Sequence, residues 1–237
     1  MAAAKPGSEK KHAGAGKGAP RRTQAPKAAA DQERTALRLR IIETALDIAE
    51  DWGWYDIRLH HVAERLKVPL TVIRSEFRDG DAIADAWIAR ADDAMLAQPA
   101  RGFAALPAEE RLQISLEAWL DALAPHRKVT AEMFGAKLWP VHVHHNLKLV
   151  TWTSRTVQWW REAALLDGEG QRRSVEEIGM TLIFLSTLAR WCRDRSEGQV
   201  RTKAFLQRSL KRADGLLACA YRSPGRVVGK LLQTGGR

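Results

Sequence analysis

Apolar side chains in the first third of the chain recur at the spacing of amphipathic helices. A long first stretch ends at Trp52, and its apolar positions lie three or four residues apart: Leu39, Ile42, Leu46 and Ala49. Gly53 follows directly, and glycine is typical of the position after a helix because it adopts backbone conformations that other residues avoid. The pattern therefore predicts one long helix with a broad apolar face that ends at Trp52.

Two shorter amphipathic stretches follow. The first covers residues 57–66, with Asp56 as its expected N-cap. A tight turn through residues 67–69 leads into the second, in which Pro69 suits a first helical turn and which ends at Phe77. A long helix, a short helix, a tight turn and a further short helix predict a three-helix helix-turn-helix unit.

The rest of the chain is also predicted to be helical, because no stretch shows the period-two alternation of a strand. We expect further helices over residues 81–97, 107–124, 125–135, 140–166, 171–194 and 200–221. The predicted fold class is all-α, with an N-terminal three-helix helix-turn-helix domain followed by a larger helical domain. The expected divisions are a disordered basic tail, the helix-turn-helix domain, the larger domain and a flexible basic tail, at residues 1–30, 31–80, 81–221 and 222–237.

The pattern over residues 34–83 resembles the DNA-binding domain of the TetR family of bacterial repressors. The matching positions are Ile42, Ala45, Leu46, Ala49, Gly53, Val62, Ala63, Leu66, Val68, Phe77 and Ile83. The resemblance implies a homodimeric transcriptional regulator that binds double-stranded DNA. It also implies that residues 81–221 form a ligand-binding and dimerisation domain, and that a small apolar ligand releases the repressor from DNA.

Three positions depart from the family pattern. Lys67 stands at the turn, where the family usually has glycine; Arg74-Ser75-Glu76-Phe77 stands where it has Tyr-x-His-Phe; and Gly80 replaces a common lysine. Arg74 could replace the tyrosine and contact a phosphate or a guanine edge. Glu76 either repels phosphate or pairs with a neighbouring arginine. The expected DNA-contacting residues are Arg38, Arg58, Lys67, Leu70, Thr71, Arg74, Ser75 and Arg78.

An altered recognition helix leaves a second interpretation open. Residues 186–197 and 204–208, together with the Phe77-x-x-Gly80 sequence, are similar to a family of accessory proteins of ubiquinone biosynthesis that has the TetR fold, binds lipid and does not bind DNA. In this alternative the protein holds an isoprenoid quinone, and residues 226–232 contact an acidic membrane.

Aromatic residues gather in the middle of the chain. They form either the wall of an apolar ligand cavity between helices or an ordinary core, since tryptophan fills volume in both. His142 and its neighbours lack the spacing of a usual zinc site, so we expect a polar pocket rim and no metal. The expected pocket residues are Trp119, Phe134, Trp139, His142, Trp152 and Trp159.

The last two long helices carry broad apolar faces that suit a four-helix dimer interface. A monomer that buries the same faces internally is the alternative. The expected interface residues are Phe184, Leu188, Trp191, Phe205, Leu206 and Leu210.

The formal net charge is +10 and is unevenly distributed. Residues 1–40 hold ten Lys or Arg against three Asp or Glu, and residues 222–237 add four bases and no acid. A basic balance suits a polyanion, either nucleic acid or an acidic membrane. The first 30 residues cannot bury apolar area, so we expect a disordered segment that either follows DNA as an arm or only aids solubility.

Several functional classes are not expected. We find no Gly-rich phosphate loop, nucleophile elbow or HExxH motif, and therefore expect neither an enzyme nor a cofactor. Cys192 and Cys219 lack metal-site spacing and are expected to be reduced, buried thiols. No apolar run has the length of a membrane span and no signal peptide is recognisable, so the expected localisation is cytoplasmic, with peripheral membrane contact only in the lipid-binding alternative.

Overall fold

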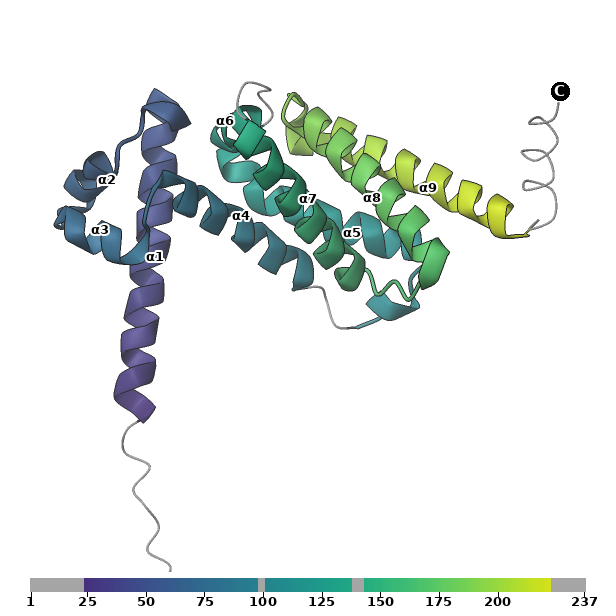
Figure 1. The fold of residues 1–237 in the computed structure, drawn as a ribbon, viewed down its shortest axis with the longest axis horizontal. Coiled ribbons are helices and arrows are strands. Elements are labelled where there is room, and N and C mark those ends of the chain that lie inside the picture. The colour runs from purple at the N-terminus through teal and green to yellow at the C-terminus, as the bar shows by residue number, and fades with distance from the viewer. Residues whose placement is uncertain (1–23, 98–100, 138–142, 223–237) are drawn as a thin grey trace, which may run out of the picture. The chain divides into compact units, whose positions relative to one another are not determined.

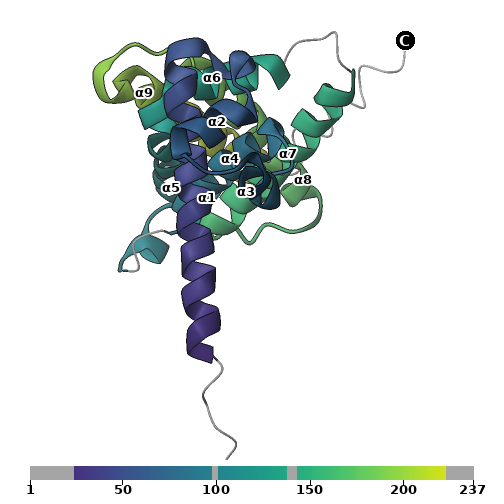
Figure 2. The same cartoon turned by 90° about the vertical axis from the view of Figure 1, so that its left-hand side faces the viewer.

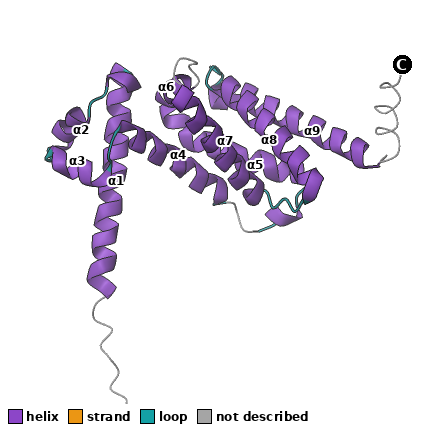
Figure 3. Cartoon of the chain, viewed as in Figure 1, coloured by secondary structure: helices purple, strands orange, loops and turns teal. Residues whose placement is uncertain are grey.

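The fold is helical throughout the part of the chain that the computed structural model describes, which is residues 24–97, 101–137 and 143–222 (Figure 3). Within these ranges the structure has no strand, so the prediction of an all-α protein is confirmed. The chain divides into two compact units, Met1–Leu39 and Arg40–Arg237. No helix of the described residues is long and apolar enough to cross a membrane.

The helices follow the predicted order. Their bounds are α1 Gln24–Trp52, α2 Leu59–Leu66, α3 Leu70–Glu76, α4 Gly80–Leu96, α5 Ala108–Leu123, α6 Arg127–Lys137, α7 Val143–Ala163, α8 Gly170–Trp191 and α9 Val200–Arg222 (Figure 1). The first helix begins at Gln24, earlier than the expected boundary near residue 31, and the preceding tail lies outside the described residues. The expected boundaries of α4 to α9 agree with the structure to within a few residues.

Two local expectations about helix ends have different outcomes. Gly53 follows α1 with φ +90°, a conformation that favours glycine, and the predicted helix end is confirmed. Asp56 is not the N-cap of α2, because it ends a short 3₁₀ helix and Arg58 is the residue that precedes α2. Asp79, which was not among the predicted caps, caps α4 by accepting a hydrogen bond of 2.8 Å from the Ala82 N–H.

Helices α2 and α3 lie beside residues 40–52 of α1 in both views (Figures 1 and 2). Each element contributes apolar side chains that are almost fully buried: Ile41, Ile42, Ala45, Leu46, Ala49, Val62, Ala63, Ile73, Phe77 and Ile83. These are largely the positions whose spacing predicted the helix-turn-helix unit. Burial of one face of a helix as short as α3 leaves its other face to solvent.

The larger domain is a layered helical body. Helix α5 packs against α4, α7 and α9, and α8 packs against α7 and α9. A buried ion pair joins α7 to α8, since Arg161 donates to Glu176 at 2.8 Å and also to the carbonyl of Gly168 at 2.7 Å. A Cβ atom on Gly168 would lie 2.4 Å from the Glu176 carboxylate, so the predicted turn between the two helices needs glycine there.

Asp194 organises the connection between α8 and α9. Its carboxylate accepts hydrogen bonds from the N–H and hydroxyl of Ser196, at 2.9 and 2.6 Å, and from the N–H and hydroxyl of Thr202, at 2.8 and 2.6 Å. Burial favours the protonated acid, but these four donors outweigh it and hold the pKa of Asp194 below its usual range. The start of α9 is therefore tied to the end of α8 through one carboxylate.

We predict that Asp194→Ala lowers the free energy of unfolding at pH 7 by about 1–3 kcal/mol, because buried donors on Ser196 and Thr202 lose their acceptor. The pKa of Asp194 is lower in the folded chain than the unfolded value of about 3.9, so its stabilisation is present above that pH and is lost as the pH falls. Urea unfolding between pH 3 and pH 7, as approximate limits around that pKa, measures both effects.

The exposed Asp121, which pairs with Lys203 at 2.9 Å, provides the control. Asp121→Ala should cost less than about 1 kcal/mol, as is usual for surface ion pairs. Equal losses in the two variants would contradict the role assigned to Asp194.

Candidate nucleic-acid interface and ligand site

The turn between α2 and α3 is built around Lys67. Its backbone is left-handed, with φ 55° and ψ 42°. The Lys67 N–H donates to the Glu64 carbonyl at 3.1 Å and the Val68 N–H donates to the Ala63 carbonyl at 3.0 Å, which is the hydrogen-bond pattern of a Schellman helix end. Glycine usually occupies such a position, and a residue with a side chain there costs about 1–2 kcal/mol. Lysine at this turn is therefore less stable than glycine would be, but it places a positive charge beside α3.

The outward face of α3 consists of the residues that the sequence predicted. Leu70, Thr71, Arg74 and Ser75 are exposed, whereas Ile73 is fully buried. The Ser75 hydroxyl donates to the Val72 carbonyl at 2.8 Å. Together these side chains make a short exposed surface with a single arginine near its end.

Flanking charges lie on either side of this face. Lys67 is exposed before α3, and Arg78 is exposed after it, where it forms an ion pair of 2.9 Å with Asp79. Glu76 is half-buried, so this acid is less exposed than Arg74. The balance of charge on the exposed α3 surface is positive, which suits contact with phosphate.

Two other predicted contact residues have different surroundings. Arg58 is exposed, but its guanidinium donates to the carbonyls of Tyr55 at 2.9 Å and Ile57 at 3.1 Å, so it braces the segment before α2. Arg38 is half-buried in the compact unit that ends at Leu39.

The segment after α1 is anchored to α6. The Glu132 carboxylate accepts a hydrogen bond of 2.8 Å from the Trp54 N–H, and the Glu132 carbonyl accepts one of 2.9 Å from the Tyr55 hydroxyl. The Lys128 ammonium, one turn earlier on α6, donates to the Glu50 carbonyl at 2.8 Å. Helix α6 therefore holds the end of α1 by one hydrogen bond and the 3₁₀ turn that follows it by two.

A second set of polar contacts lies between α1, α4 and the start of α6. The His126 ring lies 3.6 Å from the Glu43 carboxylate and 3.3 Å from that of Glu50. Arg90 of α4 pairs with Glu43. Trp87 of α4 packs edge-on against His126, and its indole N–H donates to the Thr130 hydroxyl at 2.9 Å. Movement of α4 or α6 would thus act directly on α1.

Three of the six predicted pocket residues come together in the larger domain. The centre of the Trp152 ring system lies 6.2 Å from that of Trp119 and 5.1 Å from that of Phe134, and Trp119 also stacks with Phe134. Trp119 and Trp152 both pack against Phe184 of α8. Trp119 and Phe134 are fully buried, so the rings fill a core and do not line an open cavity. We call Trp119, Phe134, Trp152 and Phe184 the aromatic cluster.

Polar atoms border the aromatic cluster. The Trp119 indole N–H donates to Asp92 of α4 at 2.8 Å. Burial raises the pKa of Asp92 above its usual range, and Asp93 adds to the shift, while Trp119, Arg155 and Thr156 oppose it. Among the described residues, the buried Trp152 indole N–H and the Thr187 hydroxyl have no hydrogen-bond partner. Unpartnered buried polar atoms are costly, and two of them in this part of the core indicate a place where a ligand could supply partners.

The other predicted pocket residues do not join this cluster. Trp159 does not reach this core, because its side chain is exposed, whereas its neighbour Trp160 is buried and donates to the Leu112 carbonyl at 2.9 Å. Adjacent helical positions point about 100° apart, so only one member of the pair faces the core. Trp139 and His142 lie outside the described residues.

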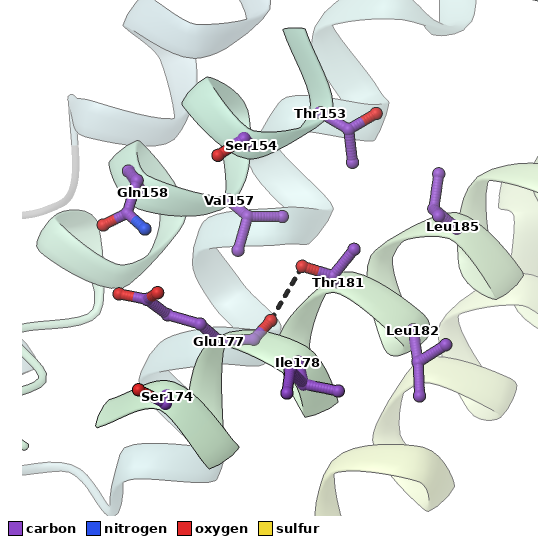
Figure 4. A pocket seen from close by; sticks show the side chains of 10 residues that line it. All are labelled: Thr153, Ser154, Val157, Gln158, Ser174, Glu177, Ile178, Thr181, Leu182 and Leu185. Carbon is purple, nitrogen blue, oxygen red and sulfur yellow. Dashed lines mark hydrogen bonds between the residues drawn. The ribbon is translucent and has the colours of Figure 1, made fainter. Parts of the chain in front are cut away.

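A groove lies on the surface between α7 and α8 (Figure 4). Its volume is about 560 Å³, and Val157, Ile178, Leu182 and Leu185 supply apolar lining. The Thr181 hydroxyl within it is already used, since it donates to the Glu177 carbonyl at 2.7 Å. None of the predicted pocket residues lines this groove.

The interface predicted on the last two helices needs correction. Five of its six residues are buried inside one chain, which leaves them little surface for a second copy: Phe184, Leu188, Trp191, Leu206 and Leu210. The sixth, Phe205, is half-buried under the Arg190 guanidinium, which lies 5.3 Å from its ring centre. The opposite face of α8 instead exposes Val175, Ile178 and Leu182.

The exposed apolar stripe of α8 is also visible in the sequence. Val175, Ile178 and Leu182 are spaced by three and four residues, and Phe184, Leu188 and Trp191 are spaced in the same way. Helix α8 therefore carries two apolar faces, one used by the core and one left uncovered. An uncovered apolar face of this kind indicates a binding surface.

Comparisons with known proteins agree with this architecture. A solved structure of the TetR transcriptional regulator from Nitrosomonas europaea ATCC 19718 is 42% identical to this chain, with a TM-score of 0.67. The match covers 76% of this chain and 98% of that regulator. No family model and no curated protein matches the chain. Identity at this level over nearly the whole of the regulator extends the similarity well beyond the helix-turn-helix unit. The chain belongs to the TetR family of transcriptional regulators.

Proposed function

We propose that the protein is a repressor that reads double-stranded DNA with α3. The observation that carries this proposal is the division of α3 into a buried face around Ile73 and an exposed face of Leu70, Thr71, Arg74 and Ser75. A helix held in this way by its neighbours is suited to the major groove. Lys67 and Arg78 would contact phosphates on either side. The similarity to a TetR regulator favours this function over that of a lipid-binding accessory protein.

Arg74 is the residue we assign to sequence reading. It is the one arginine on the described exposed face of α3, and a guanidinium pairs with the O6 and N7 atoms of guanine through two hydrogen bonds. Phosphate contacts fix the register of the protein but carry no sequence information. Loss of Arg74 should therefore affect specificity as well as affinity.

A ligand that displaces rings of the aromatic cluster, which fills a closed core without it, would release the repressor. Support comes from the unpartnered Trp152 and Thr187 polar atoms, which favour an apolar ligand that also carries hydrogen-bonding groups. Displacement of Trp119 would act on α4 through Asp92, and α4 contacts α1 through the Arg90–Glu43 pair. Ligand binding would shift the population away from the DNA-competent form.

A second copy of the chain would cover the exposed stripe of α8. Val175, Ile178 and Leu182 are half or more exposed, and the groove beside them continues the apolar surface onto α7. Two-fold pairing through this face would present two copies of α3 to two half-sites of a palindrome.

We predict that Arg74→Ala weakens binding to the preferred duplex by about 1–3 kcal/mol and relaxes the base preference at one position of each half-site. Fluorescence anisotropy with the preferred duplex and with single-base variants measures both effects. Arg101→Ala, which removes an exposed arginine outside the helix-turn-helix unit, is the control. Unchanged affinity in Arg74→Ala would remove this residue from the recognition role.

We predict that Thr187→Val raises the free energy of unfolding by about 1 kcal/mol, because it replaces an unpartnered buried hydroxyl with a methyl group of similar size. Thr202→Val is the matched control, since the Thr202 hydroxyl donates to Asp194 and its loss should destabilise the chain. Urea unfolding measures both. If Thr187→Val destabilises the chain as much as Thr202→Val, the ligand site at the aromatic cluster loses its support.

We predict a dimer in solution that Leu182→Glu converts to a folded monomer, because a charge on the α8 stripe would be desolvated without a partner. Val200→Glu is the control: Val200 is 63% exposed and Leu182 64%, but Val200 lies at the start of α9, away from the stripe. Light scattering after size-exclusion chromatography gives the mass, and circular dichroism gives the helix content. A wild-type monomer, or a Leu182→Glu dimer, contradicts the proposal.

A further inference from the structure

A second hollow lies where α8 ends and α9 begins, and its lining is dominated by arginine. Its volume is about 570 Å³. The residues that line it are Ser186, Ala189, Arg190, Arg193, Asp194, Arg195 and Arg201. We call this hollow the arginine pocket. It shares no lining residue with the groove between α7 and α8 or with the aromatic cluster.

The arginine pocket carries an uncompensated positive charge. Its one acidic lining residue, Asp194, is buried, and its carboxylate accepts hydrogen bonds from Ser196 in the connection and Thr202 at the start of α9. Among the described residues, none of the four lining arginines forms an ion pair with a carboxylate. The carbonyls at the end of α8 are also shielded, because Arg127 donates to the Trp191 and Asp194 carbonyls. A ligand would thus meet several guanidinium groups and little negative charge.

Two of the four guanidinium groups are already held in place. Arg190 lies over the Phe205 ring, 5.3 Å from its centre, and Arg193 donates to the Ala189 carbonyl at 3.4 Å. The side chains come from three successive segments: the end of α8, the connection and the start of α9. Prior placement lowers the entropic cost of binding, and convergence from three segments makes a hollow, which differs from a row of charges along one helix.

We propose that the arginine pocket binds a small phosphorylated anion with at least two phosphoryl groups. A single carboxylate would engage one guanidinium fork and leave the others unpaired, whereas several phosphate oxygens match several forks. The volume is within the range of small-molecule sites. This site is separate from the DNA-reading face and from the ligand that the aromatic cluster would hold, so the protein would respond to a second chemical class.

The test uses inorganic pyrophosphate as the probe and isothermal titration calorimetry of the full chain at constant ionic strength. We expect saturable binding with one site per chain, and a loss of affinity of about tenfold or more in the double variant Arg193→Gln/Arg201→Gln. The control is Arg208→Gln/Arg212→Gln, which removes the same charge from exposed positions of α9 outside the pocket and should bind pyrophosphate like the wild type. Inorganic sulfate at the same ionic strength should bind more weakly than pyrophosphate.

Four results would overturn the proposal. The first is the absence of saturable binding, and the second is an equal loss in the two double variants, which would mean diffuse attraction by the charge of α9. The third is an unchanged pyrophosphate affinity in Arg193→Gln/Arg201→Gln with loss of binding to random duplex DNA or to vesicles that contain phosphatidic acid. The fourth is a change of that variant from dimer to monomer without an effect on pyrophosphate, which would assign the arginines to the contact between copies.

Discussion

The structure depends on Glu132 of α6, which connects the helix-turn-helix unit to the helical body. It does so through both its side chain and its backbone carbonyl. Its carboxylate accepts the Trp54 N–H and its carbonyl accepts the Tyr55 hydroxyl. Gly53 makes this possible, because its φ of +90° turns the chain out of α1 in a conformation that other residues rarely adopt. Since the short α2 and α3 lie beside α1, this contact, made far away in the sequence, helps to set the direction of α3.

Helix α4 is the second connection, and it differs from the first in kind. Along one helix, Arg90 and Trp87 face the α1–α6 contacts and Asp92 faces the aromatic cluster. The pKa of Asp92 is raised by burial, and its bond to Trp119 is the polar contact that ties α4 to the cluster. Polar atoms of Trp152 and Thr187 that have no hydrogen-bond partner lie in the same part of the core. Helix α4 therefore connects the aromatic cluster to α1 through a short series of polar contacts.

Helical periodicity predicted the elements well, because a helix is formed by contacts between residues close in sequence. The ends of the first helices are also marked in the sequence, by Gly53 and by the turn at residues 67–69. The concentration of aromatic residues in the middle of the chain also pointed to Trp119, Phe134 and Trp152, whose rings lie together in the structure. Periodicity could not decide which apolar face of α8 is buried, since that depends on α5, α7 and α9, and the same holds for Trp159 and the adjacent Trp160. Other contacts could not be predicted in this way. The hydrogen bond between Glu132 and Trp54 and the four hydrogen bonds of Asp194 join residues whose partners cannot be read from the spacing of apolar positions.

The central claim is that α3 reads a specific sequence despite its unusual Arg74-Ser75-Glu76 segment. The most direct measurement is selection from a pool of random-sequence duplexes by the purified full chain at physiological salt, beside a version that lacks residues 1–23. We predict that both enrich the same inverted repeat, with half-sites about one helical turn apart. Binding without a shared motif, lost on removal of the basic tail, would contradict the claim.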